Sequence, residues 1–267
     1  MILSGKRYSW IGEKANEIRC FLSFWKKKFK KRMLFSFLLT ALCGRMDLKC
    51  LFLGGVTLFA YAFTFLVALA VTFVLTPVVK NFAIRIGAVD KPDARKVHHG
   101  LVPRLGGLAI YAGFMVSAIT TIGFTYEMVG IMAGATFLII VGVADDVVSL
   151  RPKVKLLGQI IAAAIPVVIF NINIDWINVP WHGIVYLPAV ISIPLTIFWI
   201  IGFINTVNLI DGLDGLAAGI ATIASIAIAL LAFQMGQWTA AAAMVAMTGA
   251  CLAFLQYNFN PAKIFMG

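Results

Sequence analysis

The chain has 267 residues, of which 61% are hydrophobic and only 12% are charged, and its formal net charge is +11. A soluble surface needs far more charged side chains, so the composition excludes a soluble globule and predicts an integral membrane protein. A nucleic-acid partner is disfavoured as well, because 12 of the 22 Lys and Arg residues lie in the first 50 positions and most of the others flank apolar segments, as they do at a membrane surface.

The first 45 residues differ from the rest of the chain. They contain the basic run KKKFKKR at 26–32 and an apolar stretch at 33–43, which is too short to span a membrane. This stretch resembles a signal-peptide core but lacks a small-residue cleavage site. We predict that 1–45 is an extension outside the working fold and that 46–267 forms the membrane domain. A basic amphipathic segment on the inner membrane surface is the alternative.

Seven apolar segments after residue 50 match the length of a membrane-spanning helix, which needs about 20 mostly apolar residues. The sequence therefore predicts an all-α fold, a polytopic membrane helix bundle with about seven transmembrane helices. The predicted spans are 51–79, 105–124, 128–144, 155–171, 187–204, 216–233 and 238–256.

The connections between these spans alternate between basic segments and segments without Lys or Arg. After residue 50, Lys and Arg occur in three places only, with six in 80–104, three in 151–155 and one at Lys263. The remaining connections hold no Lys or Arg: 125–127, 172–186 and 234–237. By the positive-inside rule, the basic loops face the cytoplasm and the other connections face outward.

The acidic residues gather on the side that is assigned to the cytoplasm. Eight acids follow residue 50, and six of them lie in or beside the basic loops and the span ends on that side: Asp90, Asp93, Asp145, Asp146, Asp211 and Asp214.

Asp145 and Asp146 end the third predicted span. Two adjacent carboxylates repel each other at the edge of a low-dielectric region, so this pair favours a bound metal ion or a proton. A solvated helix end whose charge is balanced by Arg151 and Lys153 is the alternative.

The segment NTVNLIDGLDG follows the fifth predicted span. Its polar residues recur at every third position, so a helix end would present them as one slowly drifting stripe: Asn205, Asn208, Asp211 and Asp214. Such hard oxygen donors suit Mg²⁺, which shares substrate phosphates with one or two protein groups. An Asp-Gly turn between two spans is the alternative.

Two further polar segments lie on the same predicted side. The loop at 88–107 crowds Lys, Arg and His residues into one short connection, where they either bind phosphate or only hold the protein in its orientation. The tail at 258–267 follows the seventh predicted span. A site that joins a cytosolic phosphorylated substrate to a lipid substrate would require all four polar patches on one face.

Four segments resemble, in this order, the cytoplasmic motifs of the polyprenyl-phosphate N-acetylhexosamine-1-phosphate transferases, glycosyltransferase family 4: VDKPDARKVHHGLVPRLGG, GVADDVVSLRPK, NTVNLIDGLDGLAAG and NFNPAKIFMG. The resemblance covers about 51–267. It is closer to the branch that uses UDP-N-acetylglucosamine for teichoic acid, lipopolysaccharide O-antigen or related polymers than to the branch that transfers phospho-N-acetylmuramoyl-pentapeptide.

The resemblance implies a transferase that depends on Mg²⁺, with Mn²⁺ as an alternative cofactor. It implies transfer of N-acetylhexosamine 1-phosphate, GlcNAc 1-phosphate in this branch, from a UDP-sugar to undecaprenyl phosphate with release of UMP, as the first membrane step of a cell-envelope polymer pathway. The implied partners are UDP-N-acetylhexosamine, undecaprenyl phosphate and membrane lipid, and a homodimer is left open. The implied location is the bacterial cytoplasmic membrane, with the active-site loops on the cytoplasmic face.

The resemblance also implies roles for single residues. Asp145, Asp146 and Asp211 match catalytic acids, and Asn208 matches a metal-binding amide. The implied substrate-binding residues are three members of the basic loop, an acid near the uracil and an aromatic residue that stacks on the base: Lys96, His99, Arg104, Asp214 and Phe265.

The chain departs from the family pattern at its end. In the family, FMG is followed by an aspartate that binds Mg²⁺ and by further spans, whereas this sequence ends at Gly267. We therefore expect a C-terminally truncated member, with little turnover from this chain alone. Two other functions stay open, an inactive membrane scaffold and a cation-coupled transporter, whose acids would lie near the membrane midplane.

Overall fold

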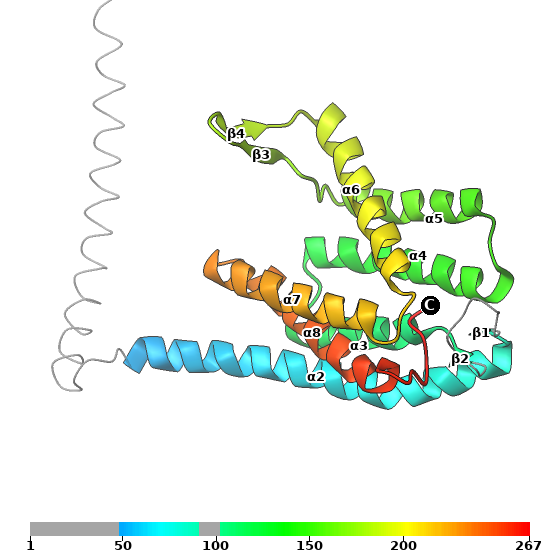
Figure 1. The fold of residues 1–267 in the computed structure, drawn as a ribbon. Helices are drawn as coiled ribbons and strands as arrows, with labels where there is room; N and C mark the ends of the chain where they lie inside the picture. The colour runs from blue at the N-terminus through cyan, green and yellow to red at the C-terminus, as the bar shows by residue number, and fades with distance from the viewer. Residues whose placement is uncertain (1–47, 91–101) are drawn as a thin grey trace, which may run out of the picture. The chain divides into compact units, whose positions relative to one another are not determined.

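The structure is a computed structural model that describes residues 48–90 and 102–267 (Figure 1). The predicted extension at 1–45 and the predicted phosphate-binding residues Lys96 and His99 lie outside the described residues. Ala60–Gly267 forms one compact unit. The described helices are α2 (Leu48–Ile86), α3 (Gly106–Thr121), α4 (Tyr126–Val148), α5 (Pro152–Ala164), its π-helical continuation η1 (Ile165–Ile169), α6 (Ala189–Ile210), α7 (Leu216–Gln234) and α8 (Trp238–Asn258).

Two small antiparallel hairpins join some of these helices. One pairs β1 (Val89–Asp90) with β2 (Val102–Pro103) beside the start of α3. The other pairs β3 (Trp176–Val179) with β4 (Gly183–Tyr186) between η1 and α6. Because the strands are this short, the fold remains a helix bundle, and the predicted all-α class is confirmed.

Six of the described helical segments are long and apolar enough to cross a membrane, judged by length and composition: Leu58–Ile86, Tyr126–Val148, Pro152–Ile169, Ala189–Ile210, Leu216–Gln234 and Trp238–Asn258. The remaining predicted span, 105–124, is the 16-residue helix α3. At a rise of about 1.5 Å per residue α3 is about 24 Å long, which is shorter than the hydrocarbon core of about 30 Å. The chain is therefore a multi-pass membrane protein with six long apolar helices in its described part.

The turn between α4 and α5 decides which residues face each other near the predicted acidic pair. α4 begins at a Thr125 cap, whose hydroxyl oxygen accepts a hydrogen bond from the Met128 N–H at 3.3 Å. The helix ends because Ser149 takes a left-handed conformation, with φ of 55°, and Pro152 then opens α5 in its first turn, where its missing N–H costs nothing. α5 consequently folds back and packs against α4.

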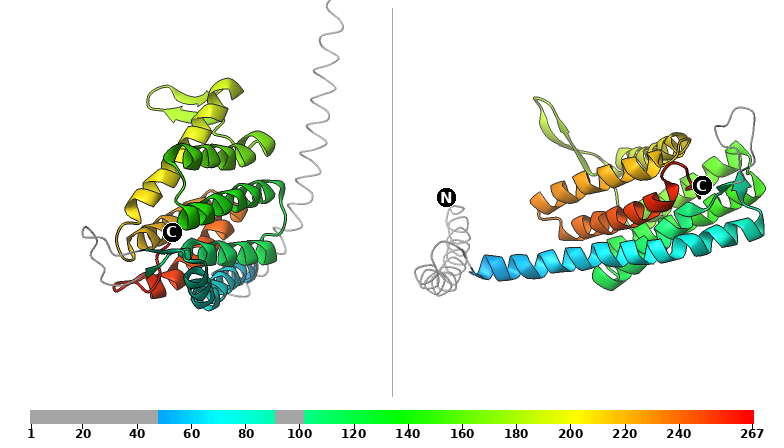
Figure 2. Two further views of the ribbon diagram at one scale, coloured as in Figure 1. Left: turned by 90° about the vertical axis from the view of Figure 1, so that its right-hand side faces the viewer. Right: turned by 60° about the horizontal axis from the view of Figure 1, so that its bottom comes forward.

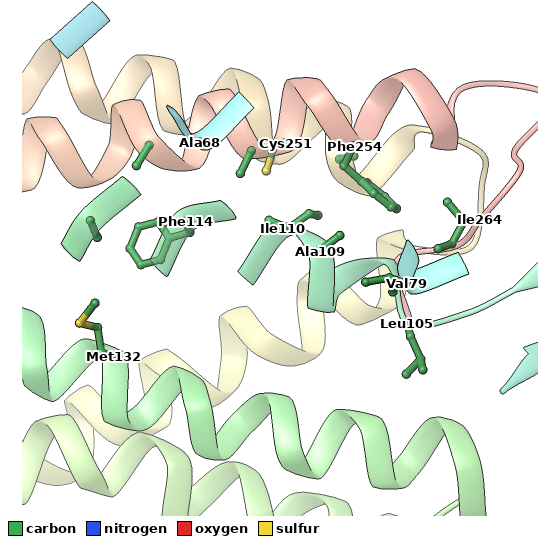
Figure 3. Packing of buried hydrophobic residues seen from close by; sticks show 14 of the residues in the cluster. Ala68, Val79, Leu105, Ala109, Ile110, Phe114, Met132, Cys251, Phe254 and Ile264 are labelled. Atoms are coloured by element: carbon green, nitrogen blue, oxygen red, sulfur yellow. The ribbon is translucent and has the colours of Figure 1, made fainter. Parts of the chain in front are cut away.

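Small residues allow the helices of the unit to approach closely. α8 packs between α7 and α3 (Figure 2). Alanine is the commonest residue of the core cluster, and Phe114 and Phe254 are its aromatic members (Figure 3). In a bilayer, helices gain stability from such close packing because lipid is as apolar as a leucine side chain. Large apolar side chains point outward instead, for example Leu66, Phe198 and Ile223.

Candidate functional site

A pocket of about 250 Å³ lies where the ends of α4 and α6 meet α5, the start of α3 and the C-terminal tail. Its polar lining comes from three helices and the turn after α6: Asp145, Asp146, Lys155, Gln159, Asn208 and Asp211. The structure thus brings together four of the predicted site residues, which lie on two segments about 60 residues apart in the sequence. All the other lining residues are apolar or glycine.

Asp145 is held by two neighbours. Its carboxylate lies 2.7 Å from the Lys155 ammonium nitrogen, and its Oδ1 accepts a hydrogen bond from the Leu150 N–H at 3.0 Å. Lys155 reaches Asp145 because the short turn brings the first turn of α5 back against the last turn of α4. The ion pair therefore orients one carboxylate and one cation at the wall of the pocket.

Asp146 and Asp211 lie next to the end of the tail. A Cβ placed on Gly267 would lie 3.1 Å from Asp146 Oδ2, and the Gly267 N–H donates to Asp211 Oδ2 at 3.3 Å. Burial raises the pKa of Asp211 to about 6, the Gly267 hydrogen bond opposes this shift, the charge of Asp146 adds to it, and Arg104 opposes it. Because the two negative carboxylates repel each other, a cation bound close to both would be stabilised.

The oxygen donors in the pocket fit Mg²⁺ that is shared with substrate phosphates. Across residues 48–90 and 102–267, no three His, Cys, Asp or Glu side chains lie close enough together to hold a metal ion alone. Asp146, Asp211 and Asn208 offer hard oxygen atoms, and Mg²⁺ commonly binds one or two carboxylates while phosphates and water complete its octahedron. The residues present therefore fit a substrate-bridged ion and not a self-contained protein cage.

The predicted stripe on NTVNLIDGLDG is divided by the end of α6. α6 ends at Ile210. Of the four residues of the stripe, two line the pocket, Asn208 and Asp211. Asn205 turns to α5, where its Nδ2 donates to Gln159 Oε1 at 2.8 Å, and Asp214 Oδ2 accepts from the Ala262 N–H at 3.0 Å. The prediction of one continuous stripe was wrong, because helical periodicity cannot continue through the Gly-containing turn.

The tail at 259–267 is fastened to the turn between α6 and α7. Buried Asn258 accepts from the Gly215 N–H at 3.1 Å and donates to the Ile264 carbonyl at 2.9 Å. Together with the contact of Asp214 to Ala262, these bonds position the tail beside the pocket. The carboxylate that was predicted to lie near a uracil thus has a structural contact and does not line the pocket.

The same tail pairs with the segment that enters α3. The Phe265 N–H donates to the Pro103 carbonyl, and the Gly106 N–H donates to the Phe265 carbonyl, both at 2.9 Å. Phe265 is half-buried here and does not line the pocket, so its predicted stacking on a base stays a prediction. Arg104 is half-buried in the same segment, and its charge reaches Asp211.

Two pocket residues were missed by the sequence-based prediction, Lys155 and Gln159. Arg151 and Lys153 were the cations considered as partners of the acidic pair. The geometry of the turn instead brings Lys155 next to Asp145. Gln159 could have been noticed as an amide within an otherwise apolar predicted span. It is 2% exposed and faces Asn205 across the contact between α5 and α6.

Comparison with known proteins agrees with the resemblance of the motifs. Glycosyl transferase family 4 matches residues 128–267. A probable undecaprenyl-phosphate N-acetylglucosaminyl 1-phosphate transferase of Bacillus subtilis is 42% identical over 204 residues, which is 76% of this chain and 57% of that protein. The decaprenyl-phosphate N-acetylglucosaminephosphotransferase of Mycolicibacterium smegmatis is 36% identical over 237 residues, with 80% and 57% of the two chains covered.

A third relative comes from the other branch. The phospho-N-acetylmuramoyl-pentapeptide-transferase of Listeria monocytogenes is 29% identical over 233 residues, which is 79% of this chain and 71% of that protein. The chain spans little more than half the length of the Bacillus and Mycolicibacterium relatives. The family match itself covers more than half of this chain and contains the acidic pair, the turn after α6 and the tail that surround the pocket, and the protein belongs to glycosyl transferase family 4.

Proposed function

We propose that the protein transfers N-acetylglucosamine 1-phosphate from UDP-N-acetylglucosamine to undecaprenyl phosphate or a similar polyprenyl phosphate, with release of UMP. The observation that carries this proposal is the convergence of Asp145, Asp146, Asn208 and Asp211 on one pocket at the ends of membrane helices. The choice of sugar follows the names of the two relatives with the higher identities. Such a reaction would begin a cell-envelope polymer pathway at the cytoplasmic membrane.

An apolar pocket beside the polar one supports a lipid acceptor. It has a volume of about 250 Å³, lies between α4, α5 with η1, and α6, and shares Leu138 and Ile204 with the polar pocket. An isoprenoid chain can be buried against such a lining while its phosphate reaches the carboxylates and Lys155. The two adjoining pockets therefore suit one substrate with a charged head and an apolar tail.

In the proposed reaction, an oxygen of the lipid phosphate forms a bond to the phosphorus that carries the sugar. The bond from that phosphorus to the UMP oxygen breaks, and UMP leaves as a phosphate monoester, which preserves all atoms and charges. Asp146, Asp211 and Asn208 would hold Mg²⁺, which supplies charge neutralisation at the phosphates when it is bound.

Side chains of the pocket are proposed to attract the phosphates and to accept a proton. Lys155, oriented by Asp145, places a positive charge at the pocket wall, where it attracts a phosphate. Asp146, which lines the pocket, is proposed to accept the proton that a lipid phosphate carries in its monoanionic form, so that the more nucleophilic dianion attacks. Because both substrates are anionic, positioning and charge neutralisation account for most of the rate increase.

We propose substrate contacts also for the residues of the basic loop and the tail. Arg104 is suited to a donor phosphate, since its charge already acts on Asp211. Lys96 and His99 are proposed to join it. Asp214 and Phe265 are proposed to act on the uridine side of the donor, with Asp214 supporting the tail through its bond to the Ala262 N–H.

The test separates donor binding from transfer. Purified protein is titrated with UDP-N-acetylglucosamine with and without Mg²⁺, and release of UMP and formation of a lipid-linked sugar phosphate are then measured after addition of undecaprenyl phosphate. We expect Mg²⁺ to strengthen donor binding and UDP-N-acetylmuramoyl-pentapeptide to be a poor donor. Folded protein that neither binds the donor nor releases UMP would contradict the proposal.

A further inference from the structure

The β3–β4 hairpin exposes aromatic side chains at the end of the bundle away from the pocket. Trp181 at its turn is 100% exposed, Tyr186 is 76% exposed and Trp176 is 51% exposed. Nearly every strand residue is exposed, so neither face of the hairpin is covered by the described part of the chain. A soluble loop would not ordinarily hold this much uncovered aromatic surface in water.

The hairpin also lacks the charges of a solvated loop. From 176 to 188 the sequence WINVPWHGIVYLP contains no Asp, Glu, Lys or Arg. It is joined at one end to the candidate span Pro152–Ile169 and at the other to Ala189–Ile210, by connections of a few residues. Both ends therefore hold the hairpin close to the level at which these helices leave the bilayer.

The base of the hairpin is tied to α6. The Leu187 N–H donates to the Asp175 carbonyl at 2.8 Å, the Ser192 hydroxyl donates to Asp175 Oδ1 at 3.4 Å, and the Ile174 N–H donates to Thr196 Oγ1 at 2.9 Å. From this base the hairpin extends past the start of α6, on the same side of the bundle as the far end of α7 (Figures 1 and 2). Its tip lies at about the level of that end of α7 (Figure 1).

We propose that the β3–β4 hairpin lies in the headgroup region of the bilayer, on the side opposite the pocket, with Trp176, Trp181 and Tyr186 as its anchors. Trp and Tyr favour this region because each has an apolar ring and a polar group that stays hydrated. The absence of charge makes burial against lipid inexpensive, and the tied base orders the hairpin before it meets the membrane. The partner of this surface is lipid.

Tryptophan fluorescence tests this placement in the full chain, reconstituted in phosphatidylcholine vesicles. One variant keeps Trp181 as its single tryptophan and a second keeps Trp199, near the middle of α6, with Phe at the other Trp positions. Lipids that carry a nitroxide quencher near the headgroup should quench Trp181 more strongly than lipids that carry it near the chain end. Trp199, which is 55% exposed along the span, should show the reverse order and serves as the depth standard.

Two results would overturn the proposal. Strong quenching of Trp181 by aqueous iodide with none by the lipids would place the hairpin in water. Protection from both quenchers would mean that protein covers it, either a second copy of this chain or another partner.

A matched pair of substitutions tests the anchoring role itself. With Trp176 as the single tryptophan, Trp181→Phe should keep the headgroup quenching of Trp176, whereas Trp181→Asp should reduce it and increase iodide quenching, because a carboxylate is excluded from the interface. Companion variants that keep Trp199 as their single tryptophan and carry the same Phe or Asp at position 181 should show unchanged quenching of Trp199 if the bundle is intact. Equal behaviour of the Phe and Asp variants would show that Trp181 does not anchor the hairpin.

Discussion

Asp145 and Asp146 are neighbours in the sequence, yet their carboxylates have different surroundings. Asp145 is paired with Lys155 and capped by the Leu150 N–H, while Asp146 lies beside the tail and close to Asp211. At the residue scale, this difference separates an orienting group from a group that is available to a substrate or a cation.

In a version of the protein that turns over, Asp146→Asn should reduce transfer by about 10²- to 10⁴-fold, the usual contribution of a positioned acid or base. Asp145→Asn should also reduce it, because Lys155 loses its orienting partner. Glu127→Gln is the matched control, since Glu127 is an exposed acid in the first turn of the same helix, α4. Release of UMP is the measurement, and near-normal rates for both Asp variants would remove the pair from the chemistry.

The affinity for Mg²⁺ should fall as the pH drops below about 6. Asp211 has its pKa raised to about 6 in the metal-free protein, so it is mostly protonated at pH 5 and mostly charged at pH 7. A carboxylate must lose its proton to bind a metal ion, so protons compete with Mg²⁺ in the acidic range only. Calorimetric titrations with Mg²⁺ at pH 5 and pH 7, in the presence of UDP-N-acetylglucosamine, test this, and Asp211→Asn should weaken binding and flatten its pH dependence.

At the element scale, the contact between α5 and α6 contains a pair of amides. Asn205 donates to Gln159 Oε1 at 2.8 Å and to the Ile201 carbonyl at 2.9 Å, and Gln159 returns a longer bond of 3.4 Å to Asn205 Oδ1. Asn208 follows one turn later on α6, and Asp211 stands directly after the last residue of the helix. The amide pair therefore sets the rotation of α6 that presents these two donors to the pocket.

A double-mutant cycle on Gln159→Leu and Asn205→Leu should give a coupling free energy of about 0.6 to 2 kcal/mol, the range for hydrogen bonds between membrane helices. Asn205→Leu leaves the buried Gln159 amide without its partner, and Gln159→Leu removes the partner of Asn205 on α5. The double variant should therefore be destabilised by less than the sum of the two single variants. Thermal unfolding in detergent measures this, and strict additivity would show that the pair does not couple the helices.

The tail can pack closely against the start of α3 because residue 106 is a glycine, which has no Cβ. A Cβ on Gly106 would collide with the Phe254 ring and the Phe265 carbonyl. Gly106→Ala should therefore destabilise the protein by about 1–3 kcal/mol, the usual cost of overpacking. Gly219→Ala is the control, because a Cβ on Gly219 in α7 meets nothing within 4 Å, and alanine favours a helix. Equal melting temperatures for the two variants would contradict this account.

At the scale of the whole molecule, the two ends of the bundle differ in character. The pocket, its acids and Lys155 lie at one end, whereas Glu127, Asp175 and the uncharged hairpin belong to the other. A transporter would need acids near the middle of its spans. The position of the pocket acids at helix ends favours a reaction at the membrane surface.

Single cysteines placed at Arg151 and Lys263 should be labelled by an impermeant maleimide only after the membrane is opened, while those at Asp175 and His182 should be labelled in intact cells. The positive-inside rule predicts this division, because every Lys and Arg after residue 50 lies in a basic loop, at an adjoining span end or in the tail on one predicted side. Arg95 should behave like Arg151. Labelling of positions 151 and 175 from the same side would contradict the topology.

The sequence by itself determined the helical class, most of the spans and the residues that gather at one end of them. These features depend on local composition, since a stretch of about 20 uncharged apolar residues has one favourable environment and polar groups must lie at its ends. Asp145, Asp146, Asn208 and Asp211 could be selected in this way because each stands at the end of such a stretch.

Only the tertiary structure decided which neighbours these residues have. The turn at 149–151 selects Lys155, and not Arg151 or Lys153, as the partner of Asp145. The end of α6 directs Asp211 to the pocket and Asp214 to the Ala262 N–H. The first pairing joins the two sides of a short turn, and the contact of Asp214 joins segments 48 residues apart. Both follow from turn geometry and helix packing, which the local periodicity of the sequence does not encode.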